Sequence, residues 1–289
     1  MNAASSGSRD RRGALAAYII LIPITLIIVA PFVWLVCAAF KTNEDFFTSI
    51  LLPRGEGFLG IAWDRLTLNN FRTLFAQGGF PRAALNSVLL SSTISVLATL
   101  FCAMGGYALV HAPFAGRKWM SRIVIAALII PPPLLLAPGF TVLYQLGLLD
   151  RMLGLILPAL APAFGVYLFR QATITSVPKE LIEAARMDGC SELRAFWRVA
   201  FPLLQPMASA FMLITFLGVW NNFLTPQIVM QTPGKFPLAV AVAQLKNTYY
   251  QDYGLLMAGT LASIVPVAGL FLLLQKDFVA GLTSGAVKG

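Results

Sequence analysis

Charged side chains are scarce in this sequence, and the few present leave long stretches without any charge. The 289 residues include 21 Lys and Arg and 12 Asp and Glu, together 11%, against about 25% in soluble domains. Six stretches contain none of these four types: 13–40, 83–116, 123–149, 152–169, 199–234 and 253–275. A membrane-spanning helix needs about 20 apolar residues, so the sequence predicts an all-α polytopic membrane protein with six spans. Soluble enzymes, secreted disulfide scaffolds and disordered proteins are excluded.

Cysteine, histidine and catalytic motifs are also scarce or missing. The three Cys residues (Cys37, Cys102 and Cys190) form no C-x-x-C pair, and with a single His they offer no zinc cluster. The sequence contains no G-x-x-x-x-G-K-[ST] loop for ATP phosphates, no H-E-x-x-H and no G-x-S-x-G. No Asp or Glu falls within a predicted span, which argues against proton-coupled transport. We therefore expect no catalytic residue, no metal and no bound cofactor.

The basic residues that are present divide unevenly between the two sides of the membrane. With a cytoplasmic N-terminus, 13 of the 21 Lys and Arg fall in the inner segments, which are 1–12, 111–122, about 170–198 and 276–289. The outer segments, near 41–82, 150–151 and 235–252, hold the other 8. Each side carries 6 acids, which leaves +7 inside and +2 outside. This is the positive-inside signature, so the net charge of +9 indicates orientation, with both termini cytoplasmic, and not nucleic-acid binding.

The chain divides into a basic tail, 1–12, and one six-span membrane domain, 13–289. The spans are expected at about 14–40, 83–110, 122–146, 152–170, 202–229 and 254–275. An outer segment, 41–82, is polar, contains Pro and Gly, and carries aromatic side chains, so we expect short helices there. A cytoplasmic tail, 276–289, follows the last span.

Two of these spans have an unusual composition. The span at 83–110 carries small hydroxylated residues that let helices approach closely in lipid, and we interpret them as packing residues: Ser87, Ser91, Ser92, Thr93, Ser95 and Thr99. The span at 122–146 carries four prolines, Pro131, Pro132, Pro133 and Pro138. Proline kinks a helix, and the freed carbonyls must be satisfied by protein or by cavity water. Broken helices of this kind recur in transporters, and a bent structural helix is the ordinary alternative.

The loop between the fourth and fifth spans predicts two short helices joined by a glycine. Pro178 suits a first helical turn, and Glu180 and Glu183 favour the positive end of a helix. Gly189 supplies the positive φ that ends this helix, and Ser191 can cap a second helix that Pro202 stops. We call residues 178–206 the elbow and expect it to lie across the cytoplasmic mouth of the membrane domain. A Glu183–Arg186 pair at i,i+3 is expected on its surface.

The elbow resembles the coupling loop of the permease subunits of bacterial ABC importers. The shared pattern is E-A-A-x-x-D-G-x-x-x-x-x-x-F followed by prolines, which here are Glu183, Ala184, Ala185, Asp188, Gly189, Phe196, Pro202 and Pro206. The short outer turn 147–158, the W-N-x-F sequence at 220–223 and the C-terminal ending 277–289 are similar to those of the shorter, six-span permease of maltose-type carbohydrate importers. The resemblance covers most of the chain from about residue 83. Two departures are Cys190, where a small residue such as Ala is common, and Asn222, where relatives often have an acid.

The resemblance implies a bacterial inner-membrane subunit that works in an assembly. Its expected partners are a second permease, two ABC ATPase subunits that hydrolyse the ATP, and an extracytoplasmic solute-binding protein. A coupling loop, 172–201, would sit in a cleft of the ATPase and transmit its closure to the spans. In that interface Glu183 would be the charged contact, Ala184 and Ala185 the close-packing face, and Gly189 the turn that sets the angle.

The residues that contact substrate are less well specified. Hydrogen bonding and ring stacking hold sugars, so we nominate one set of polar and aromatic residues, Asn86, Trp220, Asn221, Asn222 and Phe223. Interhelical packing and polar bridging is the alternative for each of them. The importer could also serve a non-sugar solute, since the elbow pattern is shared among importers. From a different class, a self-sufficient secondary transporter remains open, and a membrane-embedded enzyme lacks a nucleophile, base or metal set in the spans.

Overall fold

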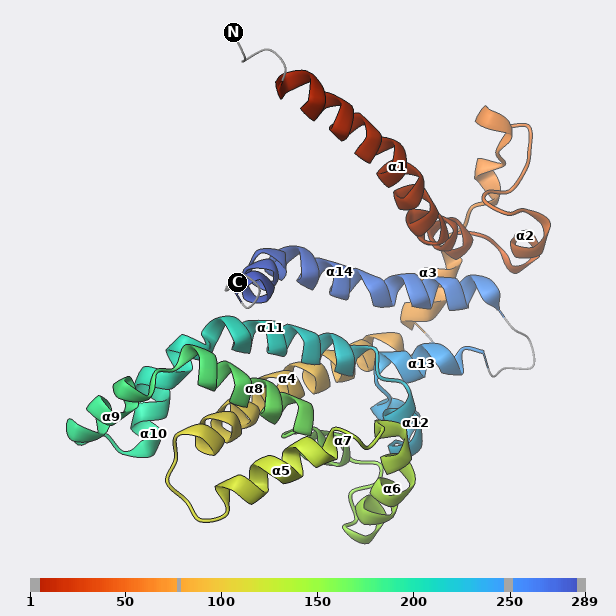
Figure 1. Cartoon of the computed structure of the whole chain (residues 1–289). Helices are drawn as coiled ribbons and strands as arrows, with labels where there is room; N and C mark the ends of the chain where they lie inside the picture. Colours follow the sequence, from red (N-terminus) through yellow and green to blue (C-terminus); the bar gives the residue numbers. More distant parts are fainter. Residues whose placement is uncertain (1–5, 77–78, 247–251, 285–289) are drawn as a thin grey trace. The chain divides into compact units, whose positions relative to one another are not determined.

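The computed structural model describes residues 6–76, 79–246 and 252–284, with side chains over 17–76, 79–246 and 252–272 (Figure 1). Within these residues the secondary structure is helical, with one isolated antiparallel bridge between Arg54 and Ile61. Five described helices are long and apolar enough to cross a membrane, or six if one sharply bent pair counts as a span. The five are Ala17–Ala39, Phe80–Val110, Met152–Ser176, Glu192–Trp220 and Tyr253–Leu272. This agrees with the six predicted spans.

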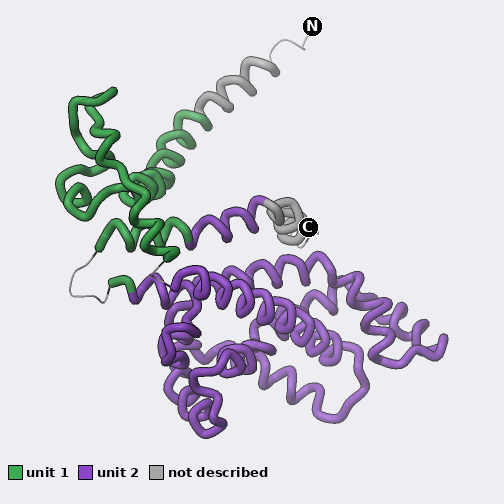
Figure 2. The backbone as a smooth tube through the Cα atoms, turned by 180° about the vertical axis from the view of Figure 1, so that it is seen from behind, with its two compact units in different colours: residues 1–78, 245–262 green, residues 79–244, 263–289 purple. Residues whose placement is uncertain are grey.

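The chain forms two compact units, 1–78 with 245–262 and 79–244 with 263–289 (Figure 2). The first unit contains α1 (Ser6–Ala39), α2 (Asn43–Thr48), η1 (Phe58–Gly60), η2 (Trp63–Arg65), α3 (Asn69–Ala76) and the start of α14 (Tyr253–Ser284). The short helices between α1 and residue 76 confirm what the composition of the outer segment predicted. α14 continues as helix through Ser284, and residues 1–5 and 285–289 of the two predicted tails lie outside the described residues.

Polar contacts hold the segment after α1 in place within the first unit. Lys41 is buried, and its ammonium donates to the carbonyls of Ser49 and Ile50 at 2.6 and 3.1 Å. The Asn70 side chain donates to the Lys41 carbonyl at 2.8 Å. The ring of Phe46 stacks on Tyr253 with centroids 4.8 Å apart. These contacts join the end of α1 to α3 and to the start of α14.

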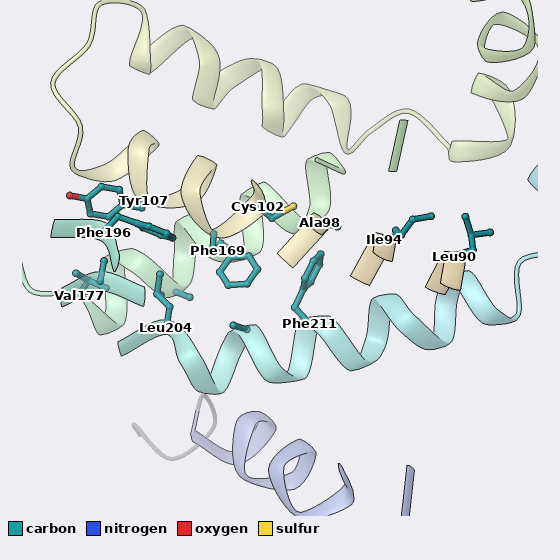
Figure 3. Packing of buried hydrophobic residues seen from close by; sticks show 14 of the residues in the cluster. Leu90, Ile94, Ala98, Cys102, Tyr107, Phe169, Val177, Phe196, Leu204 and Phe211 are labelled. Atoms are coloured by element: carbon teal, nitrogen blue, oxygen red, sulfur yellow. The ribbon is translucent and has the colours of Figure 1, made fainter. Parts of the chain in front are cut away.

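The second unit contains the remaining helices, and α4 lies at its centre. Its elements are α4 (Phe80–Val110), α5 (Arg117–Ala127), η3 (Pro132–Leu135), α6 (Leu136–Gln145), α7 (Met152–Ala159), α8 (Ala163–Ser176), α9 (Lys179–Met187), α10 (Glu192–Ala195), η4 (Phe196–Ala200), α11 (Phe201–Trp220), α12 (Leu224–Val229), η5 (Pro233–Lys235), α13 (Leu238–Gln244) and the remainder of α14. α8 and α11 pack along α4. Figure 3 shows the core between them, where the rings of Phe169 and Phe211 meet edge to face, 5.4 Å apart.

Small residues allow the close approach of α4 and its neighbours. Ser87, Ser91, Ser95 and Thr99 recur every four residues on one face of α4 and are all buried, which agrees with their interpretation as packing residues. The other two residues of the predicted set, Ser92 and Thr93, are exposed and do not pack within this subunit. The Ser87 hydroxyl also accepts from the backbone N–H of Leu238 at 2.7 Å. Such small faces are how helices come close in lipid, where no hydrophobic effect drives them together.

The predicted third and fourth spans are broken helices. For the third, over 122–146, the prolines predicted either a broken or a bent helix; it begins at Arg117 and is broken, with a bend of 104° between α5 and the pair η3 and α6. Three consecutive prolines, from Pro131 to Pro133, remove three N–H donors and push the preceding residue out of the helical region, so the helix ends instead of kinking. The fourth, expected over 152–170, is divided into α7 and α8 just before Pro162 and continues to Ser176.

The predicted fifth span, 202–229, starts close to the first residue of α11, Phe201, but its C-terminal boundary is wrong. The helix ends at Trp220, and α12 is a separate short helix. The side chain of Asn222 accepts from the Thr225 N–H at 3.3 Å, so it competes with the backbone for a helical donor and starts a new helix. At the other end, Pro202 does not stop the elbow's second helix. That helix continues from Glu192 through η4, a π-helical turn closed by Phe201 N–H on the Phe196 carbonyl, and the wider turn accommodates the proline.

Candidate functional site

The elbow forms the helix–glycine–helix unit that its sequence predicted. α9 ends at Met187, and Gly189 follows with φ +77°. The Gly189 N–H donates to the Arg186 carbonyl at 3.0 Å and the Cys190 N–H to the Ala185 carbonyl at 2.9 Å. This pair of bonds is the Schellman pattern that ends a helix with a left-handed residue. The Ser191 hydroxyl caps α10 by accepting from the Arg194 N–H at 3.4 Å.

α9 has one face buried in the second unit and one face open. Ile182 and Ala185 are buried, at 0% and 8% exposure. Glu183, Ala184 and Asp188 of the resemblance set are exposed. Of the two adjacent alanines, Ala185 is therefore turned into the core, and Ala184 alone is open to a partner. Apolar side chains are exposed here too: Leu181, which the sequence marks as unusually apolar for a solvated loop, and two that the sequence reasoning did not single out, Met187 at the end of α9, 89% exposed, and Leu193 on α10.

An ion-paired network connects the elbow to the end of α4. Arg186 on α9 pairs with Glu192 on α10, Nε to Oε1, at 2.7 Å, and also donates to the His111 carbonyl at 2.7 Å. The other oxygen of Glu192 accepts from the Tyr107 hydroxyl at 3.1 Å. The expected Glu183–Arg186 pair is therefore wrong, because Arg186 faces α4 instead of the open side. The Arg186 side chain thus bonds both to α10, through Glu192, and to the end of α4, through the His111 carbonyl. We call this contact between the elbow and α4 the junction.

The aromatic ring of Phe196 supports this junction from the core. Phe196 is 2% exposed, and its ring lies 5.5 Å from that of Tyr107 and 5.1 Å from that of Trp197. Figure 3 shows Tyr107 and Phe196 side by side at one end of the core cluster. Phe196 thus packs within this subunit, whereas Pro202, the last residue of the proposed coupling set, is exposed on α11.

The electrostatics of the elbow follow from these pairs. Lys179 bonds Glu183 at 2.8 Å with i,i+4 spacing; this hydrogen bond lowers the pKa of Glu183 and raises that of Lys179. Both side chains are largely exposed, so this pair adds little stability in water. The bond to Glu192 raises the pKa of Arg186, and burial lowers the pKa of His111. The open face of α9 therefore presents an ionised carboxylate, Glu183, at neutral pH.

A cavity of about 490 Å³ opens within the second unit, between α4, α6, α7, α11 and α12. Its lining is mostly apolar, and Asn222 and Thr225 are its polar side chains. The lining includes Pro132, at the break between α5 and α6, together with Pro158 of α7 and Pro226 of α12. An apolar cavity with a few polar groups is the usual form of a small-molecule site.

Of the five nominated substrate residues, Asn222 alone lines this cavity. Asn86 donates to the carbonyls of Gly234 and Phe236, at 3.2 and 3.1 Å, and so bridges α4 to η5. Trp220 is buried and donates to the Ser263 carbonyl at 3.3 Å. Asn221 bonds the Leu217 carbonyl of its own helix at 2.9 Å, and Phe223 is 42% exposed. Asn86, Trp220 and Asn221 thus make the contacts of packing and bridging residues.

A polar clamp, defined as Asp150 with Gln231, Thr232 and Lys235, joins the turn before α7 to η5. Asp150 has φ +56°, and its carboxylate accepts from the N–H groups of Gln231 and Thr232 at 3.0 and 2.9 Å. It also accepts from the Thr232 hydroxyl and the Lys235 ammonium, both at 2.7 Å. These bonds, led by that from Lys235, hold the pKa of Asp150 well below its usual range. The sequence had marked Gly147–Asp150 as a turn but offered no signal for its partners, which lie about 80 residues away.

Comparison with known proteins adds independent information. Residues 95–276 match the family described as "Binding-protein-dependent transport system inner membrane component". An arabinooligosaccharides transport system permease protein of Halalkalibacterium halodurans is 37% identical over 92% of this chain and 93% of its own. A lactose transport system permease protein of Rhizobium radiobacter is 29% identical over 97% and 98%. A solved bacterial ABC transporter involved in alginate import has the same fold, with a TM-score of 0.77 over 93% of this chain and 98% of that chain at 22% identity.

Proposed function

The chain belongs to the inner-membrane components of binding-protein-dependent transport systems, and we propose that it imports a sugar or oligosaccharide as one of two permease subunits of an ABC importer. Family membership rests on the match over residues 95–276 and on the 37% identity to an arabinooligosaccharide permease. The sugar assignment is supported by the names of relatives that align over nearly the whole chain. Partner ATPase subunits hydrolyse the ATP that drives import, since this chain has no nucleotide-binding motif of its own.

The observation that carries the coupling role is the attachment of an exposed helix to the central span. The open face of α9 presents Glu183, Ala184 and Met187 to solvent, while Arg186 and Glu192 bond the same helix pair to α4. A force applied to α9 by an ATPase would therefore reach α4 directly. On this proposal Glu183, Ala184, Asp188 and Gly189 form the docking surface, Ala185 and Phe196 hold the elbow on the spans, and Pro202 lies exposed at the start of α11.

The cavity is the proposed part of the substrate path. Its wall contains the ends of three broken helices and the amide of Asn222, a group that can hydrogen-bond a sugar hydroxyl. A second permease would complete the path, since this chain contributes one side of it. Sugar selectivity would then depend on both subunits and on the extracytoplasmic binding protein.

The proposed orientation places both termini and the elbow in the cytoplasm. The excess of Lys and Arg on that side supports it. A contact within the second unit is consistent with it, since the Arg186–His111 bond puts the segment after α4 and the elbow at the same end. The clamp at Asp150 then faces the outer side, where a binding protein would dock.

Co-purification from mild detergent tests the assembly. The tagged full chain, expressed with its genomic neighbours, should retain a second permease, an ATPase and a solute-binding protein, all identified by mass spectrometry. Ligand screening of that binding protein then tests the substrate: binding of oligosaccharides supports the sugar assignment, and selective binding of a non-sugar solute contradicts it. Transport by the chain alone in liposomes without ATP would contradict the importer mechanism.

A further inference from the structure

A basic groove lies beside the elbow in the second unit. It forms where the C-terminal end of α4, the N-terminal part of α5 and the C-terminal half of α8 meet. It has a volume of about 420 Å³, and its ionisable side chains are all basic: Arg117, Lys118, Arg122 and Arg170. Ser121 adds a hydroxyl, and apolar residues of the three helices complete the lining. The groove is bordered by a second hollow of about 560 Å³ that shares three of these cations. Four cations around one groove favour an anionic ligand.

The helix geometry adds to this positive charge. α5 begins at Arg117, directly after Gly116 in the left-handed region, and no side chain caps its first N–H groups. The N-terminal end of a helix carries partial positive charge, so it attracts anions and repels the two cations in its first turn, Arg117 and Lys118. Arg117 offsets part of this repulsion by donating to the Val110 and Ala112 carbonyls at 2.9 and 3.5 Å. Lys118 and Arg122 are exposed and extend the positive surface.

Arg170 is a second, independent indication that the groove binds an anion. It is the one charged residue between Met152 and Ser176, a helix pair apolar enough to span the membrane. Its Nε is buried without a hydrogen-bond partner, although its side chain lines the groove. A charge at membrane depth is costly unless it is paired, and such residues mark binding or transport sites. An anion in the groove would offset the charge of this guanidinium.

The surroundings of the groove match a membrane interface. The side chains of Trp119, Met120 and Ile123 on α5 are 67%, 51% and 61% exposed, and the Arg122 guanidinium lies 5.2 Å from the centre of the Trp119 ring. Trp favours the headgroup level of a bilayer, and Lys and Arg reach from helix ends toward lipid phosphates. Basic pockets between transmembrane helices on the cytoplasmic side suit anionic headgroups.

We propose that this groove binds the phosphate headgroup of an anionic phospholipid from the cytoplasmic leaflet. The sidedness rests on the proposed orientation, since the bond from Arg186 to the His111 carbonyl places the groove at the elbow end of the subunit. The lipid would hold α5 against α8, next to the junction through which the elbow contacts α4. It would therefore stabilise the part of the subunit that receives force from the ATPase.

Native mass spectrometry of the full chain, co-purified with its partners and placed in mixed bilayers of phosphatidylglycerol and phosphatidylcholine, tests the proposal. The triple variant Lys118→Gln, Arg122→Gln and Arg170→Gln should retain less phosphatidylglycerol, by about fivefold for each cation removed. The matched control removes three exposed arginines elsewhere, Arg54→Gln, Arg72→Gln and Arg151→Gln, and should retain as much as wild type. If Arg170→Gln prevents folding, the double variant of the two exposed cations gives the same comparison.

Three results would overturn the proposal. Equal retention of phosphatidylglycerol by the groove variant and wild type would show that the groove is not a lipid site. Displacement of the lipid by inorganic phosphate would assign the groove to a soluble phosphate. Loss of the ATPase from the groove variant with unchanged lipid would make the groove a protein interface. Because lipid retention is measured without transport, absence of any ATPase from the wild-type preparation would contradict the proposed function and leave the lipid result readable.

Discussion

Arg186 and Glu192 form an ion pair across the Gly189 turn, with Nε and Oε1 2.7 Å apart. The pair closes the angle between α9 and α10, and each partner makes one further bond to the end of α4, at the His111 carbonyl and the Tyr107 hydroxyl. The same two side chains thus stabilise the angle that Gly189 sets and attach the elbow to the central span. Changes at the turn should therefore affect coupling before they affect folding of the spans.

The first prediction concerns the backbone at Gly189. A Cβ there would meet nothing within 4 Å, so the φ of +77° is the constraint and not the space. Gly189→Val should cost about 1–2 kcal/mol of backbone strain and uncouple ATP hydrolysis from uptake, whereas Gly189→Asn, which tolerates this conformation, should stay near wild type. Uptake and ATPase rates in proteoliposomes measure this. Equal activity of the two variants would contradict the assigned role of the turn.

The second prediction separates docking from helix stability at Glu183. Glu183→Lys should weaken co-purification of the ATPase, because it reverses the charge on the open face of α9 and repels Lys179. The double exchange Lys179→Glu with Glu183→Lys restores an ion pair within α9 but leaves a positive charge at position 183. If Glu183 contacts the ATPase, the double variant remains defective. Recovery of ATPase binding by the double variant would mean that the pair acts only on the helix.

The third prediction compares neighbouring amides. Asn222 lines the cavity and Asn221 bonds its own helix. Asn222→Ser keeps an oxygen to cap α12 but removes the amide N–H donors from the cavity, and should lower uptake by about fivefold, given roughly 1 kcal/mol for a lost hydrogen bond. Asn221→Ser should have little effect. Transport assays at equal membrane abundance measure both, and a stronger effect at Asn221 would remove the cavity from the substrate path.

The fourth prediction tests the contact between α4 and α8 with two adjacent glycines. A Cβ on Gly106 would lie 2.6 Å from backbone atoms of Phe169 and Arg170, whereas one on Gly105 would be 3.5 Å from a Val166 methyl. Gly106→Ala should destabilise the detergent-solubilised protein by about 1–3 kcal/mol through overpacking, and Gly105→Ala should be tolerated. Thermal unfolding in detergent distinguishes them. Similar unfolding temperatures would show that the helices can separate at little cost.

The fifth prediction concerns pH and the clamp at Asp150. Its pKa in the folded protein lies below the usual 3.8, so ionised Asp150 stabilises the fold above pH 3.8 and that contribution is lost as pH falls through the lower, folded value. Between pH 5 and 8 the unfolding temperature should decrease from wild type to Asp150→Asn to Asp150→Ala, because Asn keeps one acceptor and the positive φ. The difference between wild type and Asn should shrink in strong acid. A difference that stays constant down to that range would contradict an ionic clamp.

Part of this structure depends only on nearby residues and was therefore readable from the sequence. Charge-free stretches of about 20 residues determine spans because each must bury its backbone groups within itself. The end of α9 at Gly189 and the cap at Ser191 also follow from local backbone chemistry. Pro202 was misread for the opposite reason, since the π-helical turn before it lets the helix continue. The strength of a helix breaker is set by the turns around it.

The roles of individual side chains depended on contacts far apart in the chain. The sequence places Ala184 and Ala185 in one motif, and the packing of α9 against the core leaves the first exposed and buries the second. Glu183 was the expected partner of Arg186, but the position of α4 gave that partnership to Glu192. Composition and local pattern thus determined the candidate membrane spans and the elbow, because hydropathy and backbone preference act over a few residues. Tertiary structure decided which side chains face a partner, a cavity or the core, because that depends on which helices meet.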